Sequence, residues 1–302
     1  MMKKTSWLEM FPHEFHAEMK ENPICYMAYG PAEPHGVYCA LGLDFFDVES
    51  VLHEAARTNG RIVAPPFGWH IQEQQYYDWE IDCCGMGMSM TSSIPEELFL
   101  HNVIHHIRNF DAKGFKAAIL ASGHFLCNMS ADMQMLADFY IRRTGSPMQI
   151  IAGTYDRYYT EGQFDDHAGP VETSLLMHYR PDLVDFSLIG KPLAVPAEIA
   201  GGNADYDPYC APKGFGSGKM PTAELGKAMA KNMVENLGKE KDRMLGAYQH
   251  NPDYKAPSVL DTEDIWNRFL KLAGRYLTIT ATRREAENEI FPIFPGWDEL
   301  GE

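Results

Sequence analysis

Metal-binding side chains follow the first apolar run of the sequence at close spacing. The run ICYMAYG, residues 24–30, leads into AEPHGVYCALGLD, where Glu33 and His35 lie two positions apart and Asp44 follows nine positions after the histidine. In extended chain, side chains two residues apart point to the same side, so Glu33 and His35 point the same way. Carboxylates and imidazoles are ligands for divalent ions such as zinc. This stretch therefore predicts a hydrolytic site built on divalent metal.

Each of these residues also has a purely structural explanation. Glu33 could be a solvated loop charge, His35 a packed polar residue, and Asp44 the N-cap of a helix that starts directly after it. These explanations hold for the residues one at a time. Their combination favours metal binding, because a carboxylate can cap a helix with one oxygen and bind an ion with the other.

Two later stretches supply further candidate ligands. The apolar run KAAILAS, residues 116–122, is followed by Gly123 and His124, and the stretch FDDHAGPVETSLLMHYRPDLV places Glu172 in the first turn of a helix. A helix dipole favours glutamate at that position without any metal. Taken together, however, the chain offers two glutamates, two histidines and one aspartate that two ions can share. Such a set is what two divalent ions bridged by an aspartate and a hydroxide require.

The segments around these stretches predict an α/β fold. Apolar runs rich in β-forming residues predict buried parallel strands, and amphipathic patterns between them predict helices. This alternation produces a mostly parallel sheet covered by helices on both faces. Ligands bind such sheets beyond the carboxyl ends of the strands, where the candidate residues lie. The predicted strands cover residues 24–30, 61–66, 116–122 and 148–153, and the predicted helices between them cover residues 44–58, 95–114 and 130–145.

Hydrophobic spacing also predicts which side of a helix faces the core. After a long loop over residues 190–220, Pro221 and Thr222 open another helix, and a last helix starts near residue 260. The predicted inward residues are Leu98, Val103, Ile104 and Ile107 in the helix over 95–114, Leu225, Met229, Met233 and Leu237 in the helix after Thr222, and Ile265, Phe269 and Leu272 in the last helix.

Composition limits the class of protein. The chain has 302 residues, 45% of them hydrophobic, which suits one large α/β domain. It carries 26 Lys and Arg against 42 Asp and Glu, without a basic cluster, so nucleic acid is not an expected partner. No apolar signal region and no stretch near the ~18 apolar residues of a membrane span is present. The six cysteines lack metal-finger spacing. We expect a soluble cytoplasmic protein with reduced thiols.

Three ordered motifs resemble the creatininase (creatinine amidohydrolase) family. YGPAEPHGVYCALGLD resembles that family's E-x-H-G and downstream D signature, ILASGHFLCN resembles its N-G-H-G-G-N stretch, and DDHAGPVETSLLMHYRPDLV resembles its H-A-G-x-x-E-T-S segment. The similarity extends through GSGKMPTAELGKAM and so covers roughly residues 22–240. It implies a single creatininase-like domain over residues 1–302, with an N-terminal arm (1–22) and a C-terminal helical extension (about 240–302).

The resemblance implies a three-layer α/β/α sandwich with a mostly parallel central sheet, assembled as a homo-oligomer, often a hexamer. It also implies metal-dependent hydrolysis of a small, often cyclic, amide by a metal-activated bridging water. Carried over position by position, it places one ion on Glu33, Asp44 and His124. The second ion would lie on His35, Asp44 and Glu172, so that Asp44 bridges. Zinc is the first choice for both ions, with manganese or iron as alternatives.

Further roles follow from the same resemblance. His167 matches the histidine of the H-A-G stretch and is expected to act as a proton shuttle, which Asp166 beside it would orient unless Asp166 binds substrate. The aromatic stretch WHIQEQQYYDWEID lies where the family has a loop over the site, and it could line the substrate pocket or a subunit contact. The residues expected in the pocket are Trp69, His70, Trp79 and Phe125.

The sequence also departs from the family pattern. Ser122 replaces an asparagine, and Phe125 and Leu126 replace two glycines. Creatininases proper have a liganding glutamate where Leu126 stands, which transfers that role to Glu172 and weakens the case for creatinine itself as substrate. A catalytically altered metal- or ligand-binding homologue on the same fold is therefore the main alternative.

Other interpretations have less support. A nucleotide-dependent oxidoreductase would need G-x-G-x-x-G after a strand, and no predicted strand is followed by it. Cys127 could be a nucleophile at a helix start, although a buried small hydrophobe explains it as well. His101, His105 and His106 have no carboxylate motif nearby in the sequence, which predicts surface or interface packing for them.

Overall fold

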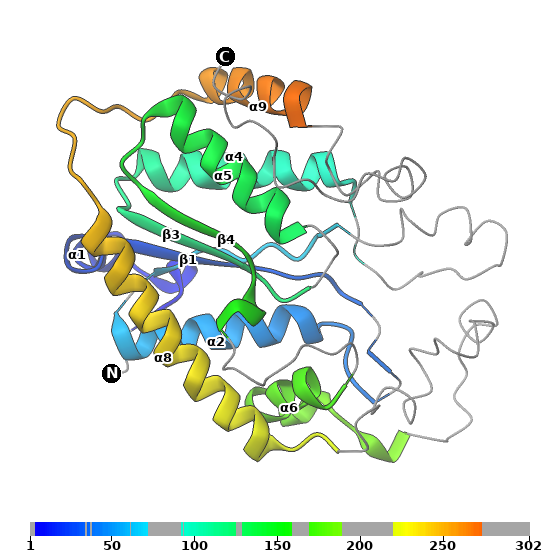
Figure 1. The fold of residues 1–302 in the computed structure, drawn as a ribbon. Coiled ribbons are helices and arrows are strands. Elements are labelled where there is room, and N and C mark those ends of the chain that lie inside the picture. Colours follow the sequence, from blue (N-terminus) through cyan, green and yellow to red (C-terminus); the bar gives the residue numbers. More distant parts are fainter. Residues whose placement is uncertain are drawn as a thin grey trace, which may run out of the picture.

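The computed structural model describes residues 4–33, 35–36, 38–60, 62–71, 92, 94–124, 129–158, 169–188 and 220–273. A parallel sheet forms the middle layer, and helices pack against both of its faces (Figure 1). The predicted three-layer α/β/α architecture is confirmed. The strands are β1 (Ile24–Tyr29), β2 (Ile62–Val63), β3 (Ala117–Ser122) and β4 (Gln149–Thr154), in the order β2-β1-β3-β4.

The two central strands end in register. β1 and β3 pair in parallel from Ile24 opposite Ala117 to Tyr29 opposite Ser122, and all six residues of each strand are buried. Burial on both faces explains why their sequences are continuous apolar runs rather than alternating ones. Because the strands end together, the segments that follow them leave the sheet at the same edge.

β2 is shorter than the predicted strand over residues 61–66. Pro65 and Pro66 lack the N–H groups that a strand needs, so the regular ladder stops at Val63. The chain still runs beside β1, since the Phe67 N–H donates to the carbonyl oxygen of Ala28. This path carries the following residues to the same edge of the sheet as the ends of β1 and β3.

Alternate residues of β1 point into different cores. Cys25, Met27 and Tyr29 join the core under one helical layer, whereas Ile24, Tyr26 and Ala28 join the core under the other. The first layer consists of α4 (Glu96–Ala112) and α5 (Met129–Thr144), with α9 (Val259–Ala273) packed on their outer side, and the second of α2 (Leu43–Asn59), α6 (Pro170–Tyr179) and α8 (Ala223–Ala247) (Figure 1). The shorter elements are α1 (Pro12–Glu21), η1 (Trp7–Glu9), η2 (Tyr155–Tyr158), η3 (Pro181–Leu183) and η4 (Phe186–Leu188).

Most of the predicted inward residues are buried, with two exceptions. Leu98 of α4 is 51% exposed, because the buried stripe of that helix runs through Phe99, Val103 and Ile107, and position 98 lies off it. Leu225 of α8 is 38% exposed. At the start of α8 it is Gly226 that faces α6, so closely that a Cβ there would lie 1.8 Å from the Ser174 carbonyl oxygen.

The ends of the long helices follow local sequence signals. Thr222 caps α8 as predicted, since its Oγ1 accepts a hydrogen bond from the Leu225 N–H.

In α9, Phe269 is fully buried and Ile265 and Leu272 are partly buried against the first core. None of the helices in the described part of the chain combines the length and apolar character that crossing a membrane requires.

Candidate metal centre

Asp44 lies in the first turn of α2 with its side chain buried. The predicted N-cap role is wrong, because α2 begins one residue earlier, at Leu43, and Gly42 occupies the N-cap position. Asp44 is the second residue of the helix and is only 2% exposed. Its two carboxylate oxygens point towards side chains from other parts of the chain.

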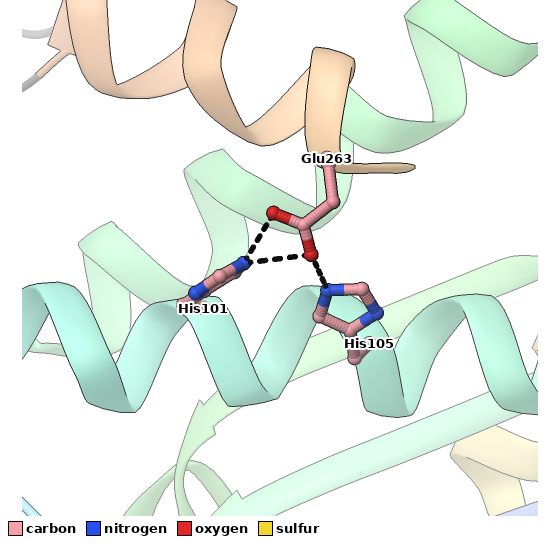
Figure 2. A group of neighbouring side chains, drawn as sticks. All are labelled: His101, His105 and Glu263. Atoms are coloured by element: carbon pink, nitrogen blue, oxygen red, sulfur yellow. Dashed lines mark hydrogen bonds and ion pairs between the residues drawn. The ribbon is translucent and has the colours of Figure 1, made fainter. Parts of the chain in front are cut away.

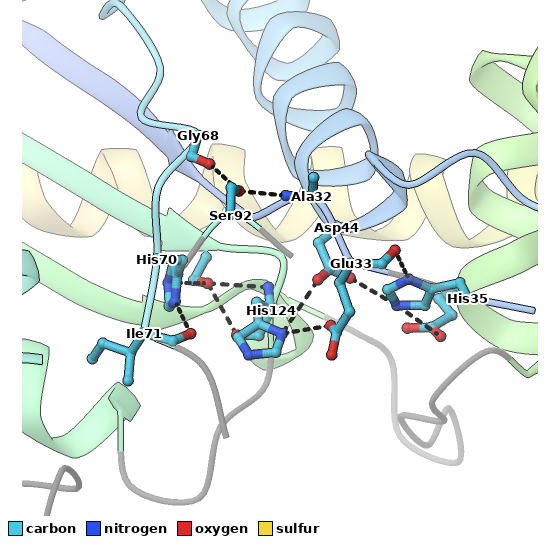
Figure 3. A network of polar contacts seen from close by, with 11 residues as sticks. Ala32, Glu33, His35, Asp44, Gly68, His70, Ile71, Ser92 and His124 are labelled. Atoms are coloured by element: carbon cyan, nitrogen blue, oxygen red, sulfur yellow. Dashed lines mark hydrogen bonds and ion pairs between the residues drawn. The ribbon is translucent and has the colours of Figure 1, made fainter. Parts of the chain in front are cut away.

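Each oxygen of Asp44 faces a different histidine (Figure 3). Oδ1 lies 3.1 Å from His35 Nε2, which also lies 3.6 Å from Glu172 Oε1. Oδ2 lies 3.2 Å from His124 Nδ1, which also lies 3.0 Å from Glu33 Oε2. The structure thus brings all five predicted ligands together in two halves. Each half contains one imidazole nitrogen, one glutamate oxygen and one oxygen of Asp44.

Four segments position these five side chains. Glu33 and His35 follow β1, and His124 follows β3, at the sheet edge where the two strands end together. Glu172 lies in the first turn of α6 as predicted, and Gly169 is the N-cap of this helix. The loop after β3 is pressed against α2: a Cβ on Gly123 would lie 1.8 Å from the carbonyl oxygen of Asp44. Only glycine permits this approach.

Hydrogen bonding prepares His35 to act as a ligand. Its Nδ1 lies 3.0 Å from the carbonyl oxygen of Glu33, which can only accept, so Nδ1 carries a proton. Nε2 is then the atom that turns towards Asp44 and Glu172. Fixing the tautomer through the far ring nitrogen is the usual arrangement for a metal-binding histidine.

The electrostatics of the cluster favour positive charge. Burial lowers the pKa of His35, but the charges of Asp44 and Glu172 outweigh it and hold the pKa well above its ordinary value. Burial also opposes protonation of His124, yet the negative charges of Glu33 and Asp44 close to its ring raise its pKa to about 10. The three carboxylates therefore attract cations into the space between them.

Two carboxylate oxygens show that the donor set fits a metal. Among the described residues, Glu33 Oε2 and Asp44 Oδ2 are buried without a hydrogen-bond partner of acceptable geometry. Leaving such atoms unpaired in the interior is costly. Nitrogen and oxygen donors in this proportion suit zinc, and carboxylate-rich sites also suit manganese. Glu33, His35 and Asp44 can each place one ligand atom within 4.8 Å of the others.

His70 lies behind His124 and is fully buried. Its Nδ1–H donates to the carbonyl oxygen of Ile71, and its Nε2 accepts from the Ser122 hydroxyl at 3.0 Å. The same hydroxyl oxygen accepts a hydrogen bond from the backbone N–H of His124. Burial, and next the charge of His124, lower the pKa of His70 to about 3, so this ring stays neutral. Ser122 thus connects His70 to the backbone of a candidate ligand.

Asp47 is a second buried carboxylate in α2 that the sequence analysis did not assign to the site. It is fully buried one turn after Asp44. Burial, and next the charge of Asp44, raise the pKa of Asp47 well above its ordinary value. The spacing of three residues on one helix face is the signal in the sequence that associates it with Asp44.

Comparison with known proteins establishes the family. A sequence model of the creatininase family, described as creatinine amidohydrolase, matches residues 9–240. The chain belongs to the creatininase family. The match includes all five clustered side chains, begins earlier than residue 22 and ends within α8, so α9 lies beyond it. No curated protein matches the sequence at a significant level.

Solved creatininase structures share the fold. A putative creatinine amidohydrolase from Bacteroides fragilis is 22% identical with a TM-score of 0.59, and the alignment covers 83% of this chain and 99% of that one. A structure titled creatininase Mn is 20% identical with a TM-score of 0.58, covering 80% and 99%. A mutant creatininase of Zn-Zn type is also 20% identical, with a TM-score of 0.56 and the same coverage.

Several residues assigned from the creatininase motifs lie outside the described residues. They are Trp79, Phe125, Leu126, Cys127, Asp166 and His167. Trp69 is described and is 54% exposed. The roles of these side chains in the shuttle and the substrate pocket stay predictions.

Proposed function

We propose that this chain is a metal-dependent amidohydrolase that cleaves a C–N bond of a small, possibly cyclic amide. The supporting observation is the division of the two Asp44 oxygens between His35 and His124. A single aspartate placed in this way can hold two ions near the ~3.5 Å separation of two-metal hydrolases. Family membership supports the reaction class, because the matching family is described as creatinine amidohydrolase.

In this proposal Glu33, Asp44 and His124 hold one divalent ion, and His35, Asp44 and Glu172 hold the other. Zinc is the first choice, with manganese or iron as alternatives; the titles of two similar structures name Mn and Zn-Zn forms. When bound, the ions would supply Lewis acidity and a water acidified from a pKa of ~15.7 towards neutrality.

The protein's own groups have distinct tasks in this reaction. The hydrogen bond from His35 Nδ1 to the Glu33 carbonyl keeps the Nε2 lone pair available. The burial of the five ligands excludes bulk water from the reacting atoms. His167 would donate a proton to the leaving nitrogen, since an amine leaves poorly without one. Asp166 would orient His167, while Trp69, His70, Trp79 and Phe125 would shape the pocket.

A catalytically altered homologue is the second candidate. It is favoured by Leu126, which stands where creatininases proper have a glutamate, and by Phe125 beside it. Such a protein would bind metal and a small ligand on the same side chains without cleaving an amide. The homo-oligomeric assembly implied by the family resemblance is common to both candidates.

Metal content and hydrolysis of the Asp44→Asn variant test the proposal. Asparagine lacks the negative charge that both ions would share. Metal affinity should fall by more than the ~10–100-fold that follows when a residue hydrogen-bonded to a ligand is lost, and hydrolysis of cyclic and linear amides should be abolished. Asp182→Asn is the matched control, because Asp182 is exposed and pairs only with Arg180 among the described contacts. Full metal content and activity in Asp44→Asn would overturn the proposal, whereas metal binding by the wild type without hydrolysis would favour the altered homologue.

A further inference from the structure

A second cluster of two imidazoles and a carboxylate lies where α4 meets α9 (Figure 2). His101 Nε2 lies 3.1 and 3.0 Å from the two oxygens of Glu263, and His105 Nε2 lies 2.6 Å from Oε1 of the same glutamate. The sequence predicts surface or interface packing for these histidines, without a carboxylate motif nearby, and the structure does pack His101 against Trp266 of α9. The carboxylate comes from a distant part of the chain. Glu263 is 158 positions away from His105 along the chain, and only the packing of α9 on α4 brings it near.

The spacing of the two histidines suits chelation. Residues four apart on a helix lie one above the other on the same face, so both Nε2 atoms of His101 and His105 reach towards α9. The three ligand atoms lie within 4.8 Å of one another. In tetrahedral zinc sites the metal–ligand bonds are ~2.0–2.1 Å long, so the ligand atoms lie about 3.3 Å from one another. Small shifts of the three side chains would therefore make room for an ion.

Neighbouring side chains hold the cluster in place and leave it accessible. The His101 ring stacks on Trp266 with centroids 4.9 Å apart and planes at 10°, and Trp266 itself is buried in the first core. The side chains of His101, His105 and Glu263 are 32%, 30% and 37% exposed. An ion can therefore reach the three donors from solvent, with water completing its coordination.

The three side chains converge closely enough for one ion to contact all of them. The ring centroids of His101 and His105 are 5.1 Å apart, and both Nε2 atoms lie within 3.1 Å of Glu263 oxygens. A single divalent ion satisfies both nitrogen lone pairs and the carboxylate together. Binding requires each imidazole to carry its proton on Nδ1, so that the Nε2 lone pair is free. Two nitrogens and one oxygen suit a borderline transition metal rather than Mg²⁺ or Ca²⁺.

We propose that His101, His105 and Glu263 bind a divalent transition-metal ion, such as Zn²⁺, that fastens α9 to α4. This site shares no residue with the candidate metal centre at the edge of the sheet. Its glutamate belongs to α9, beyond residues 9–240 that match the creatininase family. The site therefore needs one ligand from the part of this chain that the family match does not include, while His101 and His105 lie within the match.

Zinc stoichiometry of the full-length chain tests this proposal. Metal-depleted wild type, His105→Gln and Glu263→Gln are dialysed against Zn²⁺, with His250→Gln and Glu235→Gln as controls because both residues are exposed and lie outside the cluster. The two cluster variants should bind one equivalent less than wild type, or bind it at least ~10-fold more weakly, while the controls match wild type. Equal stoichiometry and affinity in all five proteins would overturn the proposal. Since the comparison counts the difference between variants, it does not depend on what the Asp44 centre binds.

A variant that replaces one ligand by another tests metal binding without removing a donor from the cluster. His105→Cys keeps a metal donor at the position, and Co²⁺ bound there should show an intense thiolate-to-cobalt charge-transfer band that Co²⁺-loaded wild type lacks. Adding Glu263→Gln to this variant should weaken the Co²⁺ affinity, measured by titrating the band, by at least ~10-fold. Absence of the band at saturating Co²⁺ would contradict metal binding by this cluster.

Discussion

Gly123 and Asp44 are in closer backbone contact than any side chain would allow. A Cβ built on Gly123 would lie 1.8 Å from the Asp44 carbonyl oxygen and 2.7 Å from the carbonyl carbon. This contact sets the distance between the loop after β3, which carries His124, and the start of α2, which carries the shared carboxylate. The geometry of the candidate metal centre thus depends on a position that contributes no candidate ligand.

Gly123→Ala should therefore damage both stability and metal binding. Because the clash is with backbone, the strands and α2 must move apart, and we expect a loss above the ~1–3 kcal/mol typical of overpacking. Gly246→Ala is the matched control: Gly246 lies inside α8 with nothing near its Cβ position, so alanine should add up to about 1 kcal/mol through helix propensity. Chemical denaturation and zinc titration of both variants measure this. A Gly123→Ala protein as stable as wild type would refute the close approach.

Ser122 should act as a positioning residue for His124. Ser122→Ala removes the hydroxyl that donates to His70 Nε2 and accepts the His124 N–H. We expect a stability loss of ~1–3 kcal/mol and metal binding weakened by ~10–100-fold. Ser122→Thr keeps the hydroxyl and should restore most of the affinity. The control is Thr58→Ala, whose exposed hydroxyl contacts only its own helix. If Ser122→Ala binds metal as tightly as wild type, the network does not position His124.

His106 should make stability depend on pH. Its Nδ1 is hydrogen-bonded to the Tyr29 hydroxyl at 2.9 Å, and burial, then the charge of His105, lower its pKa from 6.5 to about 4. Between these pH values His106 takes up a proton in the unfolded chain but not in the folded chain. The free energy of unfolding is therefore unaffected by His106 titration above pH ~6.5 and decreases as pH falls towards 4. The loss should be about 3 kcal/mol.

His106→Asn isolates this effect, because asparagine keeps an acceptor for Tyr29 and does not titrate. The difference in unfolding free energy between wild type and variant should fall between pH 7 and pH 4. His250→Asn, at an exposed histidine, should leave the wild-type pH profile unchanged. A constant difference between wild type and His106→Asn across this range would show that His106 is not held neutral.

The strands and most helix faces could be predicted because their signals are local. The apolar runs of β1 and β3 are uninterrupted since both faces are buried, and Val103 and Ile107 repeat at helical spacing. Errors arose where a neighbour decided the outcome. Leu225 is exposed because Gly226 makes the close contact with α6, and α2 starts at Leu43 because Gly42 takes the cap.

The candidate ligands could also be predicted, because strand ends gather at one edge of a parallel sheet and the family motifs mark the same residues. Their distances could not, since they depend on how Gly123 seats α2 against the sheet. The cluster around Glu263 could not be predicted either. Its parts are far apart in the sequence, and no local pattern signals that α9 packs across His101 and His105.

Anomalous diffraction from crystals of the zinc-loaded protein tests the central claim most directly. If Asp44 bridges two ions, data collected at the zinc edge should show two peaks ~3.5 Å apart, one between Asp44 Oδ1 and His35 and the other between Asp44 Oδ2 and His124. Zinc-saturated crystals with no peak beside Asp44, or with a single ion that leaves one of its oxygens unbound, would contradict the account.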